Sequence, residues 1–402
     1  MESKINYIDQ NKARWKFCLG VCLLFFLLGP EKIWIQAQET KTTLVRIAVL
    51  QDLNEFKLSI KGEFQIAELS SGKIFSTAKK LNECLVQNLP DGIRIGREKY
   101  SEDKIAITPL RGAVIYLNRQ QFRGVVNIIR IPQKGLLAVN SVDLEDYVKG
   151  VLYHEVSPRW PIEALNAQAV AARTYALYRM GSSKDKDFDL TNDIYSQVYG
   201  GKNSERYRTN LAVDQTREKI LTFQGKILPT YFHAACAGHT EDVSELWKEG
   251  LLPLKGVRCP FCVNSPHYRW KKNFRSKDVQ DKLNKNGYAI GLIQDIRVQG
   301  RNSSGRIRLL EITARDGQTV LISGKDFRNI VGPNEIRSNN YDVVMFGYYF
   351  DLLGYGWGHG VGLCQWGAFQ MAREQYKYDG ILKFYYPGAK IEDFPAVGSA
   401  VP

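Results

Sequence analysis

The sequence VDLEDYVKGVLYHEVSPRWPIEALNAQAVAARTYA spans residues 142–176 and predicts two helices joined by a proline-containing corner. The first helix, over 142–156, buries the face that carries Leu144, Tyr147, Val148 and Val151. Pro158 ends this helix, because proline cannot continue the helical hydrogen bonds. Pro161 begins the second helix, where a missing N–H costs nothing. The corner between the two helices holds Glu155 and Trp160, and we expect it to point into a cleft.

The segments on either side of this corner predict an α+β protein. Residues 44–136 alternate between apolar and polar side chains in short runs, which is typical of strands with one buried face. Further strands are expected over 292–322, and helices over 204–216, 325–331 (capped by Ser323) and 366–376. No regular alternation of strands and helices supports a doubly wound sheet. We therefore expect a β-rich N-terminal half, a helical segment that carries the active site and a mixed C-terminal part, which together form a substrate cleft. The boundaries are 44–136 for the β-rich part, 141–390 for the catalytic core and 391–402 for a tail.

The N-terminus predicts export. Four basic residues, Lys4, Lys12, Arg14 and Lys16, precede an apolar run over 17–29, which has the length of a signal-peptide core and is short for a membrane span. Residues 1–37 are therefore expected to be a signal peptide, with an uncleaved anchor as the alternative. The protein would be secreted, periplasmic or held at the outer face of the cytoplasmic membrane, and it would meet the membrane only through this segment.

Composition and charge restrict the class of partner. The 402 residues are 44% hydrophobic and 24% charged, which excludes a disordered chain. The formal net charge of +13 favours an anionic partner such as nucleic acid, anionic lipid or a carboxylate-rich cell wall. The basic residues are dispersed, and export argues further against nucleic acid. A solvated basic surface without a polymer partner is the alternative.

The predicted corner has the chemistry of a sugar-cleaving site. A glutamate beside apolar and aromatic groups has a raised pKa, which a general acid needs at neutral pH, so Glu155 is the candidate acid. Trp160 would desolvate it and stack on a sugar ring. On the second helix, Gln168 and Arg173 are polar residues among alanines, and Arg173 suits a carboxylate. The alternatives are a glutamate that caps a helix and a helix whose polar groups only face solvent.

The cysteines suggest a metal site. Cys236 and His239 form one close pair, Cys259 and Cys262 form another, and this spacing is typical of tetrahedral zinc. His233 is a competing ligand. Four protein ligands would close the site, so the zinc would be structural. Disulfides are the alternative in an exported protein.

A glycine-rich segment forms the last candidate motif. Glycine occupies every second position from Gly354 to Gly362, so an extended strand would carry one bare face for the close approach of a strand or a glycan. Trp357 and His359 would project from the other face. The pattern does not match a nucleotide-binding loop, and neither a serine-hydrolase elbow nor a zincin helix is present. A loop needed only for packing is the alternative.

Taken together, these motifs resemble the stage II sporulation protein D family (SpoIID/LytB domain), which includes amidase-enhancer proteins. The resemblance covers roughly residues 44–390, with the family's motifs in the family's order. They are LEDYVKGVL (144–152) with Glu155, Trp160-Pro161, ALNAQAVAARTYA (164–176), SQVYGG (196–201), FHAACAGHT (232–240) and GWGHGVGLCQWGA (356–368).

The resemblance implies a lytic transglycosylase that cuts peptidoglycan between N-acetylmuramic acid and N-acetylglucosamine, on strands without stem peptides, and leaves 1,6-anhydro ends. It implies catalytic roles for Glu155 and Arg173, and zinc bound through Cys236 and His239. Asn166 stands where the family often has lysine. The motifs add substrate-binding candidates, so that the full set is Trp160, Gln168, Gln197, Tyr199, Trp357, His359 and Gln365.

Two other functions stay open at this point. The chain is either the enzyme or a peptidoglycan-binding enhancer of a cell-wall amidase, and a wall protein that adheres by charge is the third alternative. A transglycosylase needs one acid/base, whereas a hydrolase needs a second carboxylate. Asp143, Glu145 and Asp146 are the candidates for it.

Overall fold

The computed structural model describes residues 42–193, 196–247 and 250–394. The predicted signal peptide or anchor (1–37) and most of the predicted tail therefore lie outside the described residues. Within those ranges the structure mixes helices with many strands, and the first hundred described residues are almost all strand, so the α+β prediction is confirmed. No helix among the described residues is long and apolar enough to cross a membrane.

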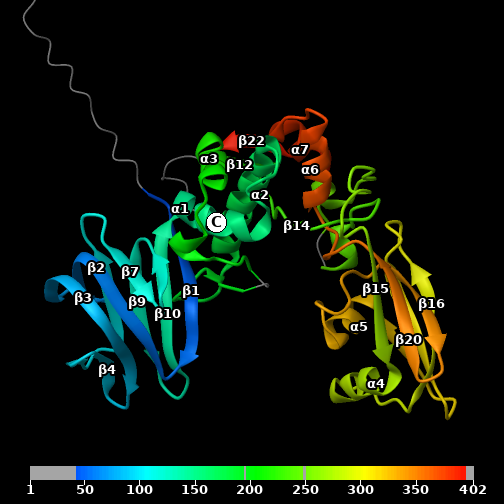
Figure 1. Cartoon of the computed structure of the whole chain (residues 1–402), viewed down its shortest axis with the longest axis horizontal. Coiled ribbons are helices and arrows are strands. Elements are labelled where there is room, and N and C mark those ends of the chain that lie inside the picture. Colours follow the sequence, from blue (N-terminus) through cyan, green and yellow to red (C-terminus); the bar gives the residue numbers. More distant parts are fainter. Residues whose placement is uncertain (1–41, 194–195, 248–249, 395–402) are drawn as a thin grey trace, which may run out of the picture. The chain divides into compact units, whose positions relative to one another are not determined.

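A large sheet builds the N-terminal part (Figure 1). Along the sheet the order is β11-β1-β10-β9-β6-β2-β3-β4-β5, with β7 paired to β2 and β8 to β7. In β2, Phe56, Leu58 and Ile60 are buried while Lys57 and Lys61 are exposed, as the alternation of the sequence predicts. The strands are β1 (Leu44–Leu53), β2 (Glu55–Glu68), β3 (Ile74–Leu89), β4 (Gly92–Ile95), β5 (Glu98–Tyr100), β6 (Lys104–Pro109), β7 (Val114–Leu117), β8 (Gln120–Phe122), β9 (Val125–Ile131), β10 (Gly135–Asp143) and β11 (Leu190–Thr191).

Three helices follow the sheet, at the positions that the sequence predicts: α1 (Leu144–Glu155), α2 (Ile162–Ser182) and α3 (Tyr207–Gln215). Helix α2 is buried on nearly all sides. Leu165 and Ala169 belong to the apolar cluster shared with the sheet, whereas Ala167 and Val170 belong to a second cluster formed with the C-terminal helices. The small side chains of α2 thus let it pack between two cores.

The second cluster is completed by elements from two distant parts of the chain. Helices α6 (Gln365–Arg373) and α7 (Tyr378–Tyr385) pack on α2, and the sequence predicted α6 but not α7. Short sheets accompany them, with the orders β13-β12-β22 and β14-β21. Their strands are β12 (Lys219–Phe223), β13 (Lys226–Ile227), β14 (Phe232–His233), β21 (Leu363–Cys364) and β22 (Lys390–Asp393), so the start of the predicted tail is a strand.

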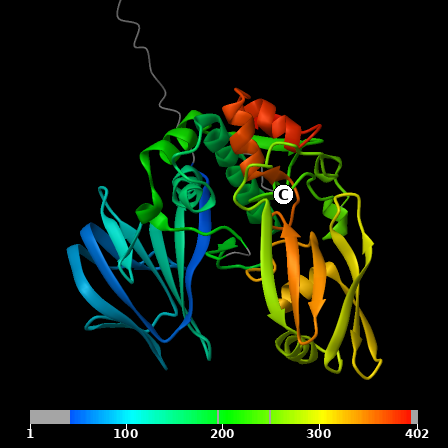
Figure 2. The same cartoon turned by 45° about the vertical axis from the view of Figure 1, so that its right-hand side comes forward.

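Residues 269–355 form strands and two helices (Figures 1 and 2), and a third apolar cluster lies within this segment. Two three-stranded sheets, β15-β20-β19 and β16-β17-β18, enclose it with two helices. The elements are β15 (Arg269–Arg275), α4 (Ser276–Lys285), β16 (Ile293–Arg301), β17 (Ile307–Ala314), β18 (Thr319–Ser323), α5 (Gly324–Val331), β19 (Tyr341–Phe346) and β20 (Tyr349–Tyr355). Ser323 caps α5 as predicted, since its Oγ accepts from the Asp326 N–H at 3.0 Å.

Candidate active site

Glu155 is the last residue of α1, at the corner where the chain turns toward α2. The next residue, Val156, is extended, and the Trp160 N–H bonds back to the Ser157 carbonyl at 3.1 Å. Pro161 is the cap residue of α2, so the second helix begins one position later than predicted. Because the backbone breaks here, the side chains of the corner project into a cavity instead of along a helix face.

The corner forms one wall of a cavity of about 910 Å³. Its lining comes from separate parts of the chain: the corner itself, the loop after β11, the segment around β14, the glycine-rich segment and the start of α6. Of the predicted site residues it brings together Glu155, Trp160, Gln197, Trp357, His359 and Gln365. It adds residues that sequence reasoning missed as site residues, among them Tyr175, Arg179, Asp193, Trp247 and Trp366. Of these, Tyr175 and Trp366 had a signal in the sequence, because each lies within one of the family motifs, 164–176 and 356–368.

Burial controls the proton affinity of Glu155. The partly buried carboxyl loses hydration, which raises its pKa from 4.5 to about 7, and a hydrogen bond from Gln365 lowers it by a smaller amount. The Gln365 Nε2 lies 3.4 Å from Glu155 Oε2. A carboxyl with this pKa is present in both protonation states near neutral pH. It can therefore donate a proton and later accept one.

Aromatic rings cover the walls beside the acid. Trp160 packs edge-on against Trp366 at 5.2 Å between ring centroids and against Phe369 at 5.1 Å. On another wall Tyr231 stacks on Trp247 at 4.5 Å. Such rings desolvate the carboxyl and offer flat faces to sugar rings.

Gln197 supplies an unused hydrogen-bond donor. Its side chain is only 2% exposed and lines the cavity. The Oε1 accepts from the Tyr147 hydroxyl at 3.0 Å, which fixes the orientation of the amide. The Nε2 is buried without a partner among the described residues. Leaving a buried donor unpaired costs stability, so this group is suited to a substrate carbonyl.

His359 is neutral in this environment. Burial and the nearby guanidinium groups of Arg328 and Arg306 lower its pKa to about 3. Its Nδ1 accepts a hydrogen bond from the Val361 N–H at 3.0 Å, so the ring hydrogen lies on Nε2. A histidine of this kind can hold a substrate by hydrogen bonding but does not act as a general acid at neutral pH.

The expectation of an extended glycine strand is wrong. Gly356, Gly358, Gly360 and Gly362 all have positive φ, between 72° and 109°, so the segment is irregular between β20 and β21. The glycines instead allow close packing within the chain. A Cβ on Gly358 would lie 2.7 Å from the His233 Cβ, and one on Gly362 would lie 2.0 Å from the Tyr231 carbonyl oxygen. Trp357 and His359 nevertheless both line the cavity.

Arg173, which the resemblance predicts to be catalytic, does not line the cavity. It is fully buried and forms a bidentate ion pair with Glu145, at 2.8 Å (Nε–Oε1) and 2.6 Å (Nη2–Oε2). It also donates to the carbonyls of Lys219 and Val213, at 3.1 and 3.2 Å. These bonds join α1, α2, α3 and β12, so Arg173 stabilises the helices that carry Glu155.

Two other predicted substrate contacts are also buried elsewhere. Tyr199 lies behind the corner, where its hydroxyl donates to Asn140 Oδ1 at 2.9 Å and its ring packs against Tyr147 at 5.3 Å. Gln168 is 1% exposed on α2. Neither residue lines the cavity. Asn166, in place of the family lysine, donates to Gln215 Oε1 at 3.3 Å and does not line it either.

A second carboxylate does reach the cavity, but it is not one of the three considered from the sequence. Asp143 caps α1, Glu145 pairs with Arg173, and neither these two nor Asp146 line the cavity. Asp193 does line it. Its Oδ1 accepts from the Thr191 hydroxyl at 3.0 Å and from the Ser196 N–H at 3.3 Å, which hold it in its loop.

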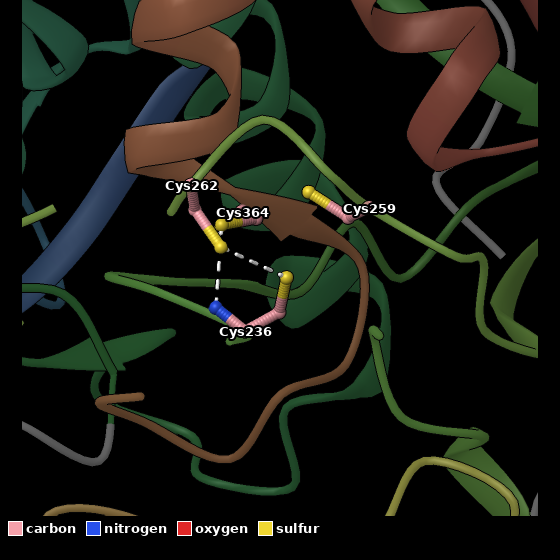
Figure 3. Close-up of side chains that lie close together, drawn as sticks. All are labelled: Cys236, Cys259, Cys262 and Cys364. Carbon is pink, nitrogen blue, oxygen red and sulfur yellow. Dashed lines mark hydrogen bonds between the residues drawn. The ribbon is translucent and has the colours of Figure 1, made fainter. Parts of the chain in front are cut away.

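Four buried cysteines form a cluster (Figure 3). The sulfur atoms of Cys236, Cys259, Cys262 and Cys364 all lie within 4.8 Å of one another, and the Cys236 and Cys262 sulfurs are 3.5 Å apart. A tetrahedral zinc with Zn–S bonds of about 2.3 Å separates its sulfurs by about 3.8 Å, whereas a disulfide needs about 2.05 Å. All five cysteines among the described residues are free thiols. The cluster therefore fits a metal ion better than a disulfide.

Cys364, not His239, completes this cluster. The His239 Nδ1 lies 2.6 Å from the Thr240 carbonyl, and the residue is outside the group. Backbone N–H groups of Cys236 and Gly367 donate to the Cys364 sulfur, at 3.3 and 3.4 Å. Such bonds favour thiolates, as in structural metal sites. His233, the other ligand considered, lines the active-site cavity instead.

Comparisons with known proteins agree with these motifs. The family model "Stage II sporulation protein" matches residues 132–223, and a domain of unknown function (DUF8618) matches residues 262–362. An uncharacterized protein of Brachyspira hyodysenteriae is 33% identical over 357 residues, which cover 88% of this chain and 94% of the relative. Stage II sporulation protein D of Bacillus subtilis is 31% identical over 279 residues, or 64% of this chain and 77% of the relative. The Bacillus subtilis amidase enhancer is 27% identical over 390 residues, or 85% of this chain and 52% of the relative.

Proposed function

The chain belongs to the stage II sporulation protein D family, and on this basis we propose that it is an exported lytic transglycosylase of peptidoglycan. The proposed reaction cleaves the glycan between N-acetylmuramic acid and N-acetylglucosamine, on strands that lack stem peptides, and leaves 1,6-anhydro ends. One observation supports the proposal above all: the Glu155 carboxyl lines a cavity with aromatic walls, and its pKa is raised to about 7.

In the proposed reaction Glu155 acts twice. Its protonated form first donates a proton to the glycosidic oxygen as that bond breaks. The resulting carboxylate then accepts the proton of the sugar's C6 hydroxyl as this oxygen attacks C1. The hydrogen bond from Gln365 stabilises the carboxylate between the two steps.

Other cavity residues would hold the sugar. The unpaired Gln197 Nε2 is placed to donate to an N-acetyl carbonyl. Trp160 and Trp366 offer aromatic faces, and stacking on them would exclude water from the reacting bond. Exclusion of water favours attack by the C6 hydroxyl over hydrolysis.

The test is to incubate the full-length chain with glycan strands stripped of their peptides and to weigh the products. We expect 1,6-anhydro ends, which are lighter by one water than hydrolysed ends. Glu155→Gln keeps the shape of the side chain but removes the acidic proton, so we expect cleavage to fall about 10²–10⁴-fold while glycan binding persists. Reducing ends formed with added water would overturn the transglycosylase mechanism.

The amidase-enhancer alternative rests on the likeness to the amidase enhancer across 85% of this chain. In that case the cavity would bind glycan and the protein would stimulate a cell-wall amidase without cutting the strand. Glu155→Gln discriminates between the two functions, because a binding protein does not need the proton. Stimulation of an amidase by both proteins, with cleavage by neither, would favour the enhancer.

We also propose that the four-cysteine cluster holds a structural zinc. Its four sulfurs would complete the coordination shell, which leaves no position for a substrate. The ion would join three segments around 236, 259–262 and 364, and thereby fix the glycine-rich wall of the cavity. Export fits this arrangement, because buried, metal-bound thiols are protected from oxidation outside the cell.

A further inference from the structure

A second cavity adjoins the active-site cavity. It has a volume of about 720 Å³ and shares Trp247, Trp357, Gly358 and His359 with the first cavity. Its other walls are α5 and the loop 333–339, both within the segment that matches a domain of unknown function. Because the same four residues line both cavities, the cavities lie side by side, and a strand longer than the first cavity would extend into the second.

The lining of the second cavity is rich in amides. Asn329 and Asn334 line it and are exposed. The Asn339 Oδ1 is buried without a hydrogen-bond partner among the described residues. Amide groups both donate and accept, so they match the hydroxyl and N-acetyl groups of amino sugars. The shared Trp247 and Trp357 add aromatic surface.

The second cavity is also positively charged. Lys325 and Arg328 line it, and no carboxylate is present among its described lining residues. The Arg328 guanidinium donates to the carbonyls of Ile336, Pro333 and Arg337, at 2.8, 3.2 and 3.3 Å, and forms no ion pair with any described carboxylate. Burial and the nearby Arg306 lower its pKa to about 10. The Lys325 Nζ likewise donates to a backbone carbonyl, that of Leu246, at 2.5 Å. Two cations whose partners are carbonyls and not carboxylates keep their net charge, which attracts an anionic ligand.

The acidic side chains nearest in sequence are engaged elsewhere. Asp326 accepts a hydrogen bond from the Ser323 hydroxyl at 2.7 Å, and Glu335 forms an ion pair with Lys272. Neither lines the cavity.

We propose that the second cavity is a subsite for the continuing glycan strand and selects muramic acid units that carry a free carboxylate. This inference rests on the proposed function, since it assumes that the strand passes Glu155. Removal of a stem peptide leaves a lactyl carboxylate on each muramic acid. That carboxylate would bind Lys325 and Arg328, and the asparagines would bind the sugar hydroxyl and N-acetyl groups. The 262–362 segment would thus bind substrate and play no part in the chemistry.

The experiment measures binding and not cleavage. The full-length Glu155→Gln protein is titrated with peptide-free glycans of two lengths, and with chitooligosaccharides of the same lengths, which lack the lactyl carboxylate. In this background Lys325→Gln is introduced, because the Lys325 side chain is exposed, whereas Arg328 holds the loop. Loss of one charge-assisted hydrogen bond should lower the ratio of long-strand to short-strand affinity about tenfold. We expect no such change for chitooligosaccharides.

Lys285→Gln is the matched control, because Lys285 is an exposed lysine of α4 outside both cavities, and it should leave the ratio unchanged. An unchanged ratio in the Lys325→Gln protein, or an equal change with chitooligosaccharides, would overturn the subsite. The proposed reaction is tested separately with the Glu155 protein. If binding depends on strand length but no cleavage is found, the subsite is supported and the reaction is rejected. If the strand is cleaved but binding does not depend on its length, the reaction is supported and the subsite is rejected.

Discussion

The side-chain amide of Gln365 contacts the carboxylate of Glu155, with Nε2 3.4 Å from Oε2. The two residues are 210 positions apart in the chain, at the end of α1 and at the start of α6. This contact joins the helical corner to the glycine-rich segment. It also sets part of the proton affinity of the candidate acid, because a donor facing a carboxylate favours its charged form.

The pH dependence of cleavage should report this contact. Glu155 must be protonated to act as the acid, so kcat/KM should fall as the pH rises through about 7. Gln365→Leu removes a donor that stabilises the carboxylate, which raises the pKa of Glu155 and shifts the falling limb to higher pH. Gln370→Leu, on the same helix outside the cavity, is the control. A shift to lower pH in Gln365→Leu would contradict this account.

Asp193 decides between transglycosylase and hydrolase chemistry. A hydrolase needs a second carboxylate, whereas a transglycosylase uses the substrate's own hydroxyl. We expect Asp193→Asn to keep the 1,6-anhydro product, with a loss of rate below about tenfold because the residue only lines the cavity. Product masses and initial rates check this. A loss as large as that of Glu155→Gln would assign the second carboxylate role to Asp193.

Gln197 should contribute to substrate binding. Gln197→Leu removes the unpaired Nε2 donor, and we expect kcat/KM to fall about tenfold, the effect of one lost hydrogen bond. Tyr147→Phe is the comparison, because it removes the partner of Oε1 but leaves the donor itself. Steady-state kinetics, with thermal unfolding to confirm the fold, measure both variants. Equal kinetics for Gln197→Leu and the parent protein would show that the donor is not used.

Arg173 should affect cleavage activity by stabilising the folded protein. Breaking a buried ion pair costs about 3–5 kcal/mol, so Arg173→Met alone should lower the free energy of unfolding by that amount and reduce activity with it. Replacing both partners, in Arg173→Met/Glu145→Leu, leaves no unpaired charge and should recover much of the stability. Denaturant unfolding and cleavage are measured together. A stable double variant without activity would restore the catalytic interpretation of Arg173.

The cysteine cluster predicts one zinc per chain. Cys364→Ser should lower the zinc content and the Tm, because the fourth ligand is lost, and chelation should destabilise the parent protein in the same way. His239→Asn is the control and should keep the zinc, since His239 lies outside the cluster. Metal analysis and thermal unfolding measure both effects. Zinc lost from His239→Asn but retained in Cys364→Ser would reverse the ligand assignment.

Local sequence patterns predicted those helices and strands whose ends or buried faces depend on residues only a few positions away. Pro158 and Pro161 interrupt a helix whatever the tertiary contacts are, so the corner that carries Glu155 can be predicted from the sequence. The alternation in β2 and the Ser323 cap of α5 likewise depend on neighbours a few residues away. Helix α7 was missed because its aromatic residues pack into a core that local sequence does not reveal.

The roles of single polar residues depended on partners far along the chain. The resemblance predicted a catalytic role for Arg173, whereas in the structure its hydrogen bonds go to Glu145 and to the carbonyls of Val213 and Lys219. The fourth cysteine of the cluster, Cys364, lies about a hundred residues from Cys262, so no local spacing indicated it.

The sequence by itself determined the α+β class, the backbone break after Glu155, and the family, because these follow from local spacing and ordered motifs. The tertiary structure alone decided which side chains share the cavity. A pKa near 7 requires that distant segments remove water from one carboxyl, and a metal cluster requires four sulfurs within a few ångströms. Both conditions depend on distances through space. The packing of α2 against two cores sets these distances, and they cannot be read from the order of residues along the chain.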